Sequence, residues 1–306
     1  MSNPMSQALI TLGRRYVRDA PGTLGKAALA ARYLNPRLGD QPRRRVAQDR
    51  FGSRFAVDTQ DLIQRYLYLF GVWEPHMTHW LRRSLKPGDT FIDVGANIGV
   101  FSVLGSRLVG STGRVVAIEA SPTFHRRLLR HAALNHRDNI RAVNVAVSDV
   151  RETLTFVLAS SHNMGANSIV PYDGPAESTF AIEAVPLAEL LEPDEVARAR
   201  VIKIDVEGAE GSAVRGLAPV LDGLRPDAEI AVEITPDRMG QLGDSVDELL
   251  STMRTHGFHA YRLPTEYAPA SYPRAIRRPV APLRRRRPIV GETELIFSRV
   301  DAEALT

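Results

Sequence analysis

The sequence predicts an α/β fold with a mostly parallel sheet and helices on both faces. From residue 90 onward, short apolar runs alternate with helical patterns, which is typical of a parallel sheet. The first run, "TFIDVG" (90–95), is uninterrupted, as expected for a strand buried on both faces. The last two runs, "FHAYRL" (258–263) and "ELIFSRV" (294–300), have no helical pattern between them. They therefore predict an antiparallel pair at one edge of the sheet.

The other elements follow from hydrophobic periodicity. Apolar residues at helical spacing predict helix over 58–85, broken near Gly71 and Pro75, before the turn "KPGDT". Residues 1–50 are rich in Arg and Ala and predict short helices and loops of low order. The remaining strands are expected at 114–120, 140–149, 153–159, 180–185, 199–206 and 228–235. The remaining helices are expected near 98–109, 122–136, 187–192, 207–221 and 245–256.

Length and composition indicate a globular protein. The chain has 306 residues, of which 44% are apolar and 24% charged, so a core can form without covalent staples. No cysteine is present, which excludes disulfides, thiolate metal sites and a cysteine nucleophile. We expect an Arg-rich N-terminal extension over 1–57 and one domain over 58–306. That domain carries an Arg/Pro-rich insertion at 264–292.

The charge balance is mildly basic and uneven. Lys and Arg number 39 against 35 Asp and Glu, a formal net charge of +4, and arginines crowd both the N-terminal region and the segment 274–287. Genome base composition is the simpler explanation, but such clusters also suit phosphates or an anionic membrane surface. No apolar run is long enough to span a bilayer, and no secretory signal is evident. We expect a cytoplasmic protein, with peripheral contact at the inner face of the membrane as a further option.

The stretch "DVGANIGVFS" (93–102) follows the first strand, where open α/β sheets bind ligands. A dinucleotide fingerprint needs G-x-G-x-x-G, and a Walker A loop needs a terminal G-K-[ST]. Here Gly95 and Gly99 have the spacing G-x-x-x-G around Asn97, with Asp93 ahead of them. Both phosphate-binding interpretations therefore fail. S-adenosylmethionine (SAM) remains, because this ligand has no phosphate.

Polar residues at successive strand ends suit the groups of SAM. Asp93 can accept a hydrogen bond from the ligand's ammonium, directly or through water, and backbone N–H groups near Asn97 can receive its carboxylate. Glu119 ends the second strand and can accept both ribose hydroxyls. Ser148 and Asp149 are expected to end the third strand and meet the adenine edge. The alternative for the glycine loop alone is a tight turn with a helix cap at Asn97.

With these motifs the sequence resembles the FkbM family of SAM-dependent methyltransferases. The resemblance covers about residues 60–235 and rests on the run from "GVWEPH" to "VVAIEASP", on "VNVAVSD" and on "VIKIDVEGAEGSAVRGL". It implies a seven-stranded, Rossmann-like class I methyltransferase fold and O-methylation of sugar, glycolipid or secondary-metabolite hydroxyls. Glu74 matches the family's aromatic–Glu pair before the first strand. This implies contact with the ligand's amino group or the acceptor; a buried helix-terminal ion pair is the alternative.

The motif "KIDVEGAE" supplies the candidate catalytic groups. Lys203 and Asp205 occupy alternate strand positions and so face the same side, with Asp205 at the carboxyl end. Asp205 could act as base, orient a water, or bind a divalent ion together with Glu233. Lys203 could orient the acceptor or form a structural ion pair. We predict no metal site, since two carboxylates are a thin basis for one, and a divalent ion is the less favoured alternative.

Three further side chains complete the candidates. Glu207 and Glu210 lie in the first turn of the next helix, where carboxylates also serve as simple helix caps. His162, in the loop "SSHNMGANS", is a third candidate for the acceptor or base role. A solvent-exposed loop histidine is its ordinary alternative.

Two other functions compete with a small-molecule or glycan O-methyltransferase. The arginine clusters allow an RNA methyltransferase. However, base N-methylases commonly carry an Asn/Asp-Pro-Pro-aromatic motif where this chain has "KIDVEG", so a nucleic acid partner is not expected. A catalytically silent SAM-fold binding protein is the other alternative, which the acidic strand ends argue against. The acceptor and the oligomeric state cannot be read from the sequence.

Overall fold

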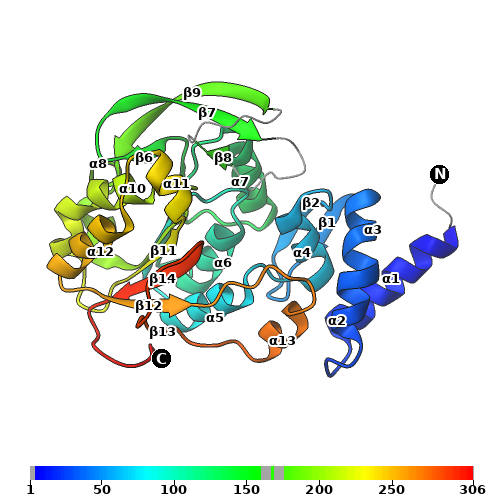
Figure 1. Ribbon diagram of the computed structural model, residues 1–306. Coiled ribbons are helices and arrows are strands. Elements are labelled where there is room, and N and C mark those ends of the chain that lie inside the picture. The colour runs from blue at the N-terminus through cyan, green and yellow to red at the C-terminus, as the bar shows by residue number, and fades with distance from the viewer. Residues whose placement is uncertain (1–3, 160–166, 169–175, 306) are drawn as a thin grey trace. The chain divides into compact units, whose positions relative to one another are not determined.

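The computed structural model describes residues 4–159, 167–168 and 176–305 (Figure 1). Two compact units can be distinguished among them. The first unit contains residues 4–79 and 265–280, and the second contains the other described residues from 80 onward. The second unit holds the loops that carry most of the candidate site residues.

The second unit is built on an eight-stranded sheet. In spatial order its strands are β13 (Leu283–Arg284), β12 (His259–Leu263), β14 (Thr293–Ser298), β11 (Glu229–Ile234), β10 (Ala199–Ile204), β3 (Thr90–Val94), β4 (Arg114–Ile118) and β5 (Ile140–Val143). The five strands from β11 to β5 are parallel, and β14 runs antiparallel to both of its neighbours. The predicted fold class is confirmed. The strand beyond the expected seven, β13, arises because two residues of the 264–292 segment pair with β12.

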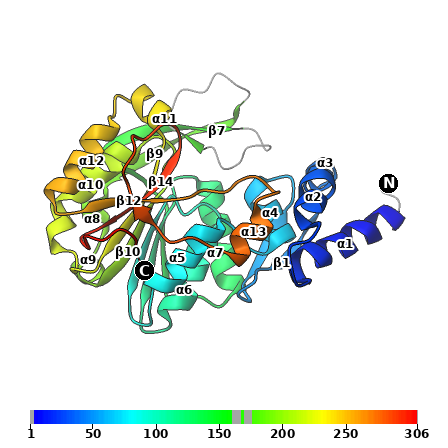
Figure 2. The same cartoon turned by 60° about the horizontal axis from the view of Figure 1, so that its bottom comes forward.

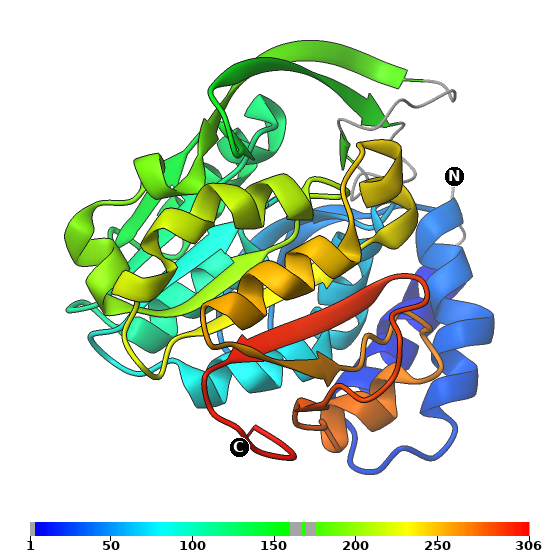
Figure 3. The same cartoon turned by 60° about the vertical axis from the view of Figure 1, so that its left-hand side comes forward.

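Helices cover both faces of this sheet. Those of the second unit include α6 (Val100–Val109), α7 (Pro122–Leu134), α8 (Leu187–Leu190), α9 (Pro193–Arg198), α10 (Glu210–Leu217), η2 (Ala218–Gly223), α11 (Pro236–Gln241) and α12 (Val246–Thr255). Figure 3 shows α10 (yellow-green) and α12 (orange) together on one face.

Alternate positions of β3 explain why both faces are covered. Ile92 and Val94 are fully buried in one apolar core with Val214 of α10 and Met253 of α12. Phe91 points the other way, so closely against α6 that a Cβ on Gly105 would lie 2.4 Å from its ring. Since successive side chains of a strand face opposite sides, an unbroken apolar run requires cover on both.

A separate four-stranded sheet corrects one prediction. It has the order β6 (Ala146–Ser148), β9 (Ala176–Pro186), β7 (Glu152–Ala159) and β8 (Asn167–Ser168). The single strand predicted over 140–149 was wrong, because β5 ends at Val143 and β6 belongs to this second sheet. The side chain of Asn144 bonds the carbonyls of Glu119 and Ala120 at 2.8 and 2.9 Å, which turns the chain between the two strands.

The first unit is more ordered than predicted. Its elements are α1 (Pro4–Asp19), α2 (Lys26–Leu29), the π-helix η1 (Ala30–Leu34), α3 (Asn35–Asp40), the hairpin β1 (Arg44–Gln48) and β2 (Arg54–Asp58), α4 (Leu62–Phe70), the start of α5 (Pro75–Ser84) and α13 (Tyr272–Arg277). The short helices predicted over residues 1–50 are present, whereas the longer helix α1, the hairpin and the helix α13 in the 264–292 segment were not predicted. Ile10 and Val17 of α1 are 1% and 3% exposed, so burial within the unit stabilises this helix.

Within the described ranges, none of the helices combines the length and the hydropathy needed to cross a bilayer.

Candidate functional site

The carboxyl ends of four parallel strands bring the main candidate residues together. Asp93 in β3 lies directly beside Lys203 in β10. Glu119 follows the last residue of β4, Asp205 follows that of β10, and Glu233 lies near the end of β11. Parallel strands end at the same edge of a sheet, so side chains distant in sequence converge there. The sequence predicts ligand binding at this same edge of the sheet.

The glycine loop after β3 is held tightly. Gly95 and Gly99 have φ of +79° and +82°, in the left-handed region that favours glycine. The N–H groups of Gly95 and Ala96 both donate to the carbonyl of Ile118, at 2.9 and 3.0 Å. A Cβ on Gly99 would lie 2.9 Å from the side chain of Leu128 in α7. The loop geometry therefore requires glycine at these positions even before a ligand is considered.

Glu119 is the hydrogen-bond acceptor that holds this loop in place. Its two carboxylate oxygens accept hydrogen bonds from the backbone N–H groups of Asn97 and Ser121, at 2.7 and 2.8 Å. Asn97 adopts φ +50°, and its own side chain accepts from the N–H of Ile98. Burial raises the pKa of Glu119 to about 7. The two hydrogen bonds oppose this shift, and the nearby carboxylates of Asp93 and Asp205 add to it. Each of its oxygens can accept a second hydrogen bond.

Asp93 lies deeper. Its side chain is 1% exposed and accepts a hydrogen bond of 2.5 Å from the hydroxyl of Ser102 in α6. Burial raises the pKa of Asp93, although Lys203 and Ser102 oppose the shift. The carboxylate thus fastens the start of α6 to β3. Ser102 was not among the predicted site residues, although it lies within the quoted stretch.

Lys203 and Asp205 form a close pair, so the prediction that they face the same side is confirmed. Lys203 Nζ lies 2.6 Å from Asp205 Oδ2 and 5.2 Å from the centre of the Phe101 ring, and its side chain is 2% exposed. Burial alone would raise the pKa of Asp205. The ammonium of Lys203, a hydrogen bond with Glu233 and the charge of Arg238 outweigh it and lower that pKa. Asp205 is therefore a carboxylate at neutral pH.

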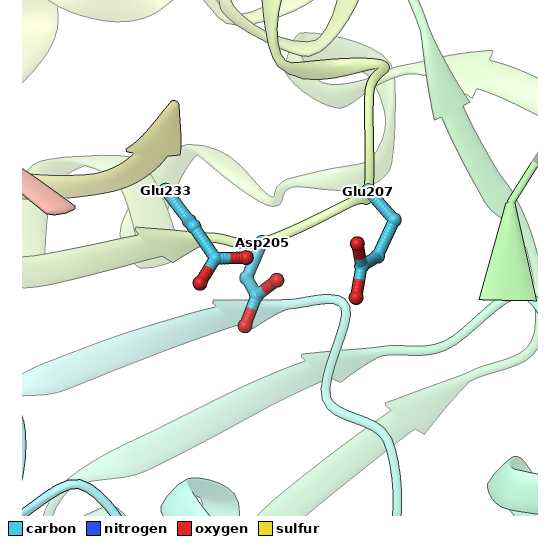
Figure 4. Close-up of side chains that lie close together, drawn as sticks. All are labelled: Asp205, Glu207 and Glu233. Carbon is cyan, nitrogen blue, oxygen red and sulfur yellow. The ribbon is translucent and has the colours of Figure 1, made fainter. Parts of the chain in front are cut away.

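Two further carboxylates face Asp205. Oxygen atoms of Asp205, Glu207 and Glu233 all lie within 4.8 Å of one another, and Figure 4 shows the three side chains turned toward a common space. Carboxylate oxygens suit Mg²⁺. Yet Lys203 pairs with Asp205, and Arg238 of α11 pairs with Glu207, so two cations already offset much of this negative charge. Sequence reasoning missed Arg238, because nothing in "TPDRMG" marks it as a partner of Glu207.

Glu210 has a structural place beside this cluster. It is fully buried, and its oxygens accept from the N–H of Gly208 at 2.8 Å and the hydroxyl of Thr235 at 3.1 Å. Burial raises the pKa of Glu210 to about 7. It thereby fixes the loop in which Glu207 and Gly208 adopt φ of +55° and +113°. Glu210 supports the loop that presents Asp205 and Glu207.

Ser148 ends β6 and Asp149 directly follows it, so neither residue ends a strand of the main sheet as predicted. Ser148 Oγ bonds Glu152 at 2.8 Å, and Asp149 pairs with Arg215 of α10 at 2.6 Å. Burial would raise the pKa of Asp149, but Arg215 holds it below its ordinary value. Their contact with adenine stays a prediction, and it would be made from the end of β6 in the second sheet instead of from the main sheet. His162 lies outside the described residues.

Glu74 belongs to the first unit. It is 6% exposed and has φ +40°; its N–H donates to Tyr272 Oη at 3.2 Å, and its Oε1 accepts from Tyr267 Oη at 3.2 Å. Trp73 stacks on the Tyr267 ring at 5.6 Å. The structure thus places the aromatic–Glu pair in a cluster of tyrosines. Its assignment to the cofactor stays a prediction.

Comparison with known proteins places this geometry in a family context. The family model described as the methyltransferase FkbM domain matches residues 93–260, more than half of the chain. A curated relative, the hexuronic acid methyltransferase AglP of Haloferax volcanii, is 24% identical over 174 residues, covering 57% of this chain and 68% of the relative.

Solved structures with a similar fold share little sequence. Aeropyrum pernix fibrillarin in complex with SAM is 12% identical with a TM-score of 0.42, over 83% of this chain and 82% of that protein. An SAM-dependent O-methyltransferase from Thermotoga maritima is 13% identical with a TM-score of 0.41, over 85% of this chain and 79% of that protein.

Proposed function

The chain belongs to the FkbM methyltransferase family and is a SAM-dependent methyltransferase, and we propose that it methylates a hydroxyl group of a sugar-containing acceptor. The observation that carries this proposal is the ionised Asp205, paired with Lys203 at the strand ends and facing two more carboxylates. The relative from Haloferax volcanii, named for hexuronic acid, supports a sugar as the acceptor class.

The hydrogen-bonding groups of the site fit SAM. The two carboxylate oxygens of Glu119 can accept hydrogen bonds from both ribose hydroxyls. These two hydrogen bonds would offset the free-energy cost of burying the carboxylate. Backbone N–H groups at the start of α6, next to Asn97, suit the ligand's carboxylate. Asp93 accepts a hydrogen bond from the ligand's ammonium, directly or through water, in addition to the one from Ser102, because a carboxylate has several acceptor sites. Ser148 and Asp149 are assigned to the adenine edge, and Glu74 to the amino group.

The catalytic roles follow from charge and position. Bound SAM supplies a methyl group made electrophilic by the sulfonium. Asp205 accepts a hydrogen bond from the acceptor hydroxyl and directs its oxygen at the methyl carbon. As the carbon–oxygen bond forms and the carbon–sulfur bond breaks, the hydroxyl proton passes to Asp205. Lys203 fixes the Asp205 rotamer and keeps it ionised. His162 remains a candidate for contact with the acceptor.

The acidic surroundings favour a neutral hydroxyl over a carboxylate as the acceptor atom. Lys203 and Arg238 offset two of the three negative charges of Asp205, Glu207 and Glu233, so a net negative charge remains to repel an anionic acceptor group, whereas a hydroxyl can donate a hydrogen bond to a carboxylate. For a sugar acid, this predicts an ether at a ring hydroxyl rather than a methyl ester. The two products differ chemically, because mild alkali hydrolyses the ester and leaves the ether intact.

The test is radiolabelled methyl transfer from SAM to a panel containing hexuronic acid glycans, neutral glycans and RNA. We expect label in glycan, stable to mild alkali, with Asp205→Asn retaining SAM binding but losing transfer. Asp247→Asn, an exposed carboxylate in the first turn of α12, is the matched control and should keep full turnover. Label released by alkali would overturn the hydroxyl assignment, and label in RNA would support the alternative function. Unchanged turnover in Asp205→Asn would dismiss Asp205 as catalytic.

The cofactor assignment has its own test. S-adenosylhomocysteine is expected to raise the melting temperature of the protein, while NAD does not, because only a ligand that binds the folded state stabilises it. Equal shifts with both ligands, or no shift with either, would contradict the SAM site.

A further inference from the structure

We propose that the first unit binds an anionic membrane surface through α1 and the loop that follows it. This inference goes beyond methyl transfer and does not depend on the acceptor. It rests on an exposed apolar patch and a basic cavity that meet at one side chain, Lys26.

The exposed apolar patch consists of Leu9, Leu12, Tyr16 and Leu24, hereafter the α1 patch. The first three follow one another at helical spacing of three and four residues, so they share a face of α1. They are 53%, 63% and 40% exposed, and Leu24 in the following loop is 87% exposed. The hydroxyl of Tyr16 donates to the carbonyl of Leu24 at 2.6 Å, which holds the loop against the helix. Figure 2 shows α1 from the side, along its full length.

The opposite face of α1 is already occupied. Ile10 and Val17 are buried within the unit, and Gly13 lies close to the side chain of Leu34. Packing within the unit therefore accounts for one apolar face of the helix but not for the α1 patch. Large apolar side chains grouped on a surface mark a site of interaction.

A cavity of about 280 Å³ lies beside this patch in the same unit. Its lining includes four cationic side chains and one carboxylate, which are Arg18, Lys26, Arg50, Arg277 and Asp19. We call it the basic cavity. Lys26 is 4% exposed and donates to the carbonyl of Ala20. It also lies 5.7 Å from the centre of the Tyr16 ring, which connects the cavity with the α1 patch.

The cations of the basic cavity are incompletely balanced. Burial lowers the pKa of Lys26, and the charges of Arg50 and Arg277 lower it further, whereas Asp19 acts in the opposite direction. Arg18 pairs with the single carboxylate, Asp19, at 3.5 Å, and both Arg18 and Arg50 donate hydrogen bonds to backbone carbonyls. A bound anion would reduce the repulsion among these groups.

An anionic bilayer matches both features at once. Leucine and tyrosine side chains enter the boundary between headgroups and acyl chains, and nearby cations bind lipid phosphates. A second copy of the chain, joined through the same patch, would bring two basic cavities together, which is unfavourable. Charge complementarity therefore selects a lipid surface over self-association.

The test uses the full chain and vesicles of phosphatidylcholine, alone or mixed with phosphatidylglycerol in equal parts. We expect binding to the mixed vesicles that weakens with salt and is absent with phosphatidylcholine alone. Leu12→Ser combined with Leu24→Ser should weaken this binding about tenfold, because two exposed apolar side chains are lost. Leu129→Ser, at a leucine of α7 that is 46% exposed, is the matched control and should bind like the wild type.

A charge variant tests the basic cavity separately. Arg277→Glu should also weaken binding about tenfold, whereas Arg254→Glu, at an exposed arginine of α12, should not. Both target side chains are exposed, so folding should persist, which circular dichroism checks. Equal binding to both vesicle types, or wild-type binding by both the Leu12/Leu24 and Arg277 variants, would overturn the proposal. So would light scattering that shows a wild-type dimer dissociated by the Leu12/Leu24 change.

Discussion

The backbone carbonyl oxygen of Asp205 lies where a side chain on Gly95 would have to be. A Cβ on Gly95 would be 1.8 Å from that oxygen, and the N–H of Asp205 donates to the carbonyl of Val94 at 3.0 Å. The loop that carries the glycines and the loop that carries the candidate catalytic carboxylate are therefore in direct backbone contact. A change in one loop must displace the other.

We expect Gly95→Ala to abolish methyl transfer and to destabilise the protein. The new methyl group would collide with a backbone carbonyl, and φ +79° is unfavourable for alanine. Together these effects cost about 2–5 kcal/mol. Gly240→Ala in α11 is the matched control, because a Cβ there meets nothing within 4 Å. Thermal unfolding and SAM titration check the pair. A Gly95→Ala variant as stable and active as Gly240→Ala would refute the contact.

Glu119 should make SAM binding depend on pH. With its pKa near 7 in the unliganded protein, it must lose a proton before its carboxylate can accept both ribose hydroxyls. We expect affinity for S-adenosylhomocysteine to rise about tenfold between pH 6 and pH 8. Glu119→Gln should bind about 10- to 100-fold more weakly at pH 8 and lose most of this dependence. Calorimetric titration at several pH values measures both effects.

The raised pKa of Glu119 also predicts how the stability of the unliganded protein changes with pH. The folded-state pKa of Glu119 is raised above its ordinary value of 4.5, so the folded state holds the proton more tightly than the unfolded state. The unliganded protein should therefore lose stability as pH rises from about 4.5 to about 7. Glu119→Gln should make this slope shallower, and Glu210, whose pKa burial also raises to about 7, should maintain the remainder. Glu248→Gln, at an exposed residue of α12, should leave the slope unchanged. A melting temperature that rises over this interval in the wild type would contradict the burial effect.

Much of the sheet could be predicted because its strands are continuous apolar runs. β3 and β10 were found within one residue or two of their expected bounds, and Asp205, expected inside the carboxyl end of the strand, directly follows the last residue of β10. The division of residues 140–149 was not predictable in this way. Apolar residues continue across the break, and the turn depends on hydrogen bonds from Asn144 to carbonyls that are distant in sequence.

The candidate site shows the same limit. Alternation along the strand was enough to place Lys203 beside Asp205. The partner of Glu207 was not predictable, because Arg238 reaches it from another element. Whether a cluster of carboxylates is balanced depends on such long-range pairs. Local sequence therefore indicates the acids of a site better than its net charge.

Lys203 and Asp205 should behave as one energetic unit. Lys203→Met would leave a carboxylate without its cation, so we expect destabilisation by about 3–5 kcal/mol, a raised pKa for Asp205 and an acid limb of the kcat profile displaced to higher pH. Adding Asp205→Asn should recover part of the lost stability, because the uncompensated charge is removed. Urea unfolding of the two single variants and the double variant measures the coupling. Additive effects of the two changes would show that the pair is not coupled.

Removal of divalent metal should leave methyl transfer unchanged. Three carboxylates share a space within 4.8 Å, a set that Mg²⁺ could bind, but Lys203 and Arg238 already supply two positive charges to them. An incoming cation would have to displace or repel these groups. We therefore expect equal initial rates with excess EDTA and with added Mg²⁺. Arg238→Gln sharpens the measurement, because it removes one competing charge and should make any weak metal binding stronger. If EDTA abolished turnover in the wild type and Mg²⁺ restored it, the ion pairs would be secondary to a metal site formed by Asp205, Glu207 and Glu233.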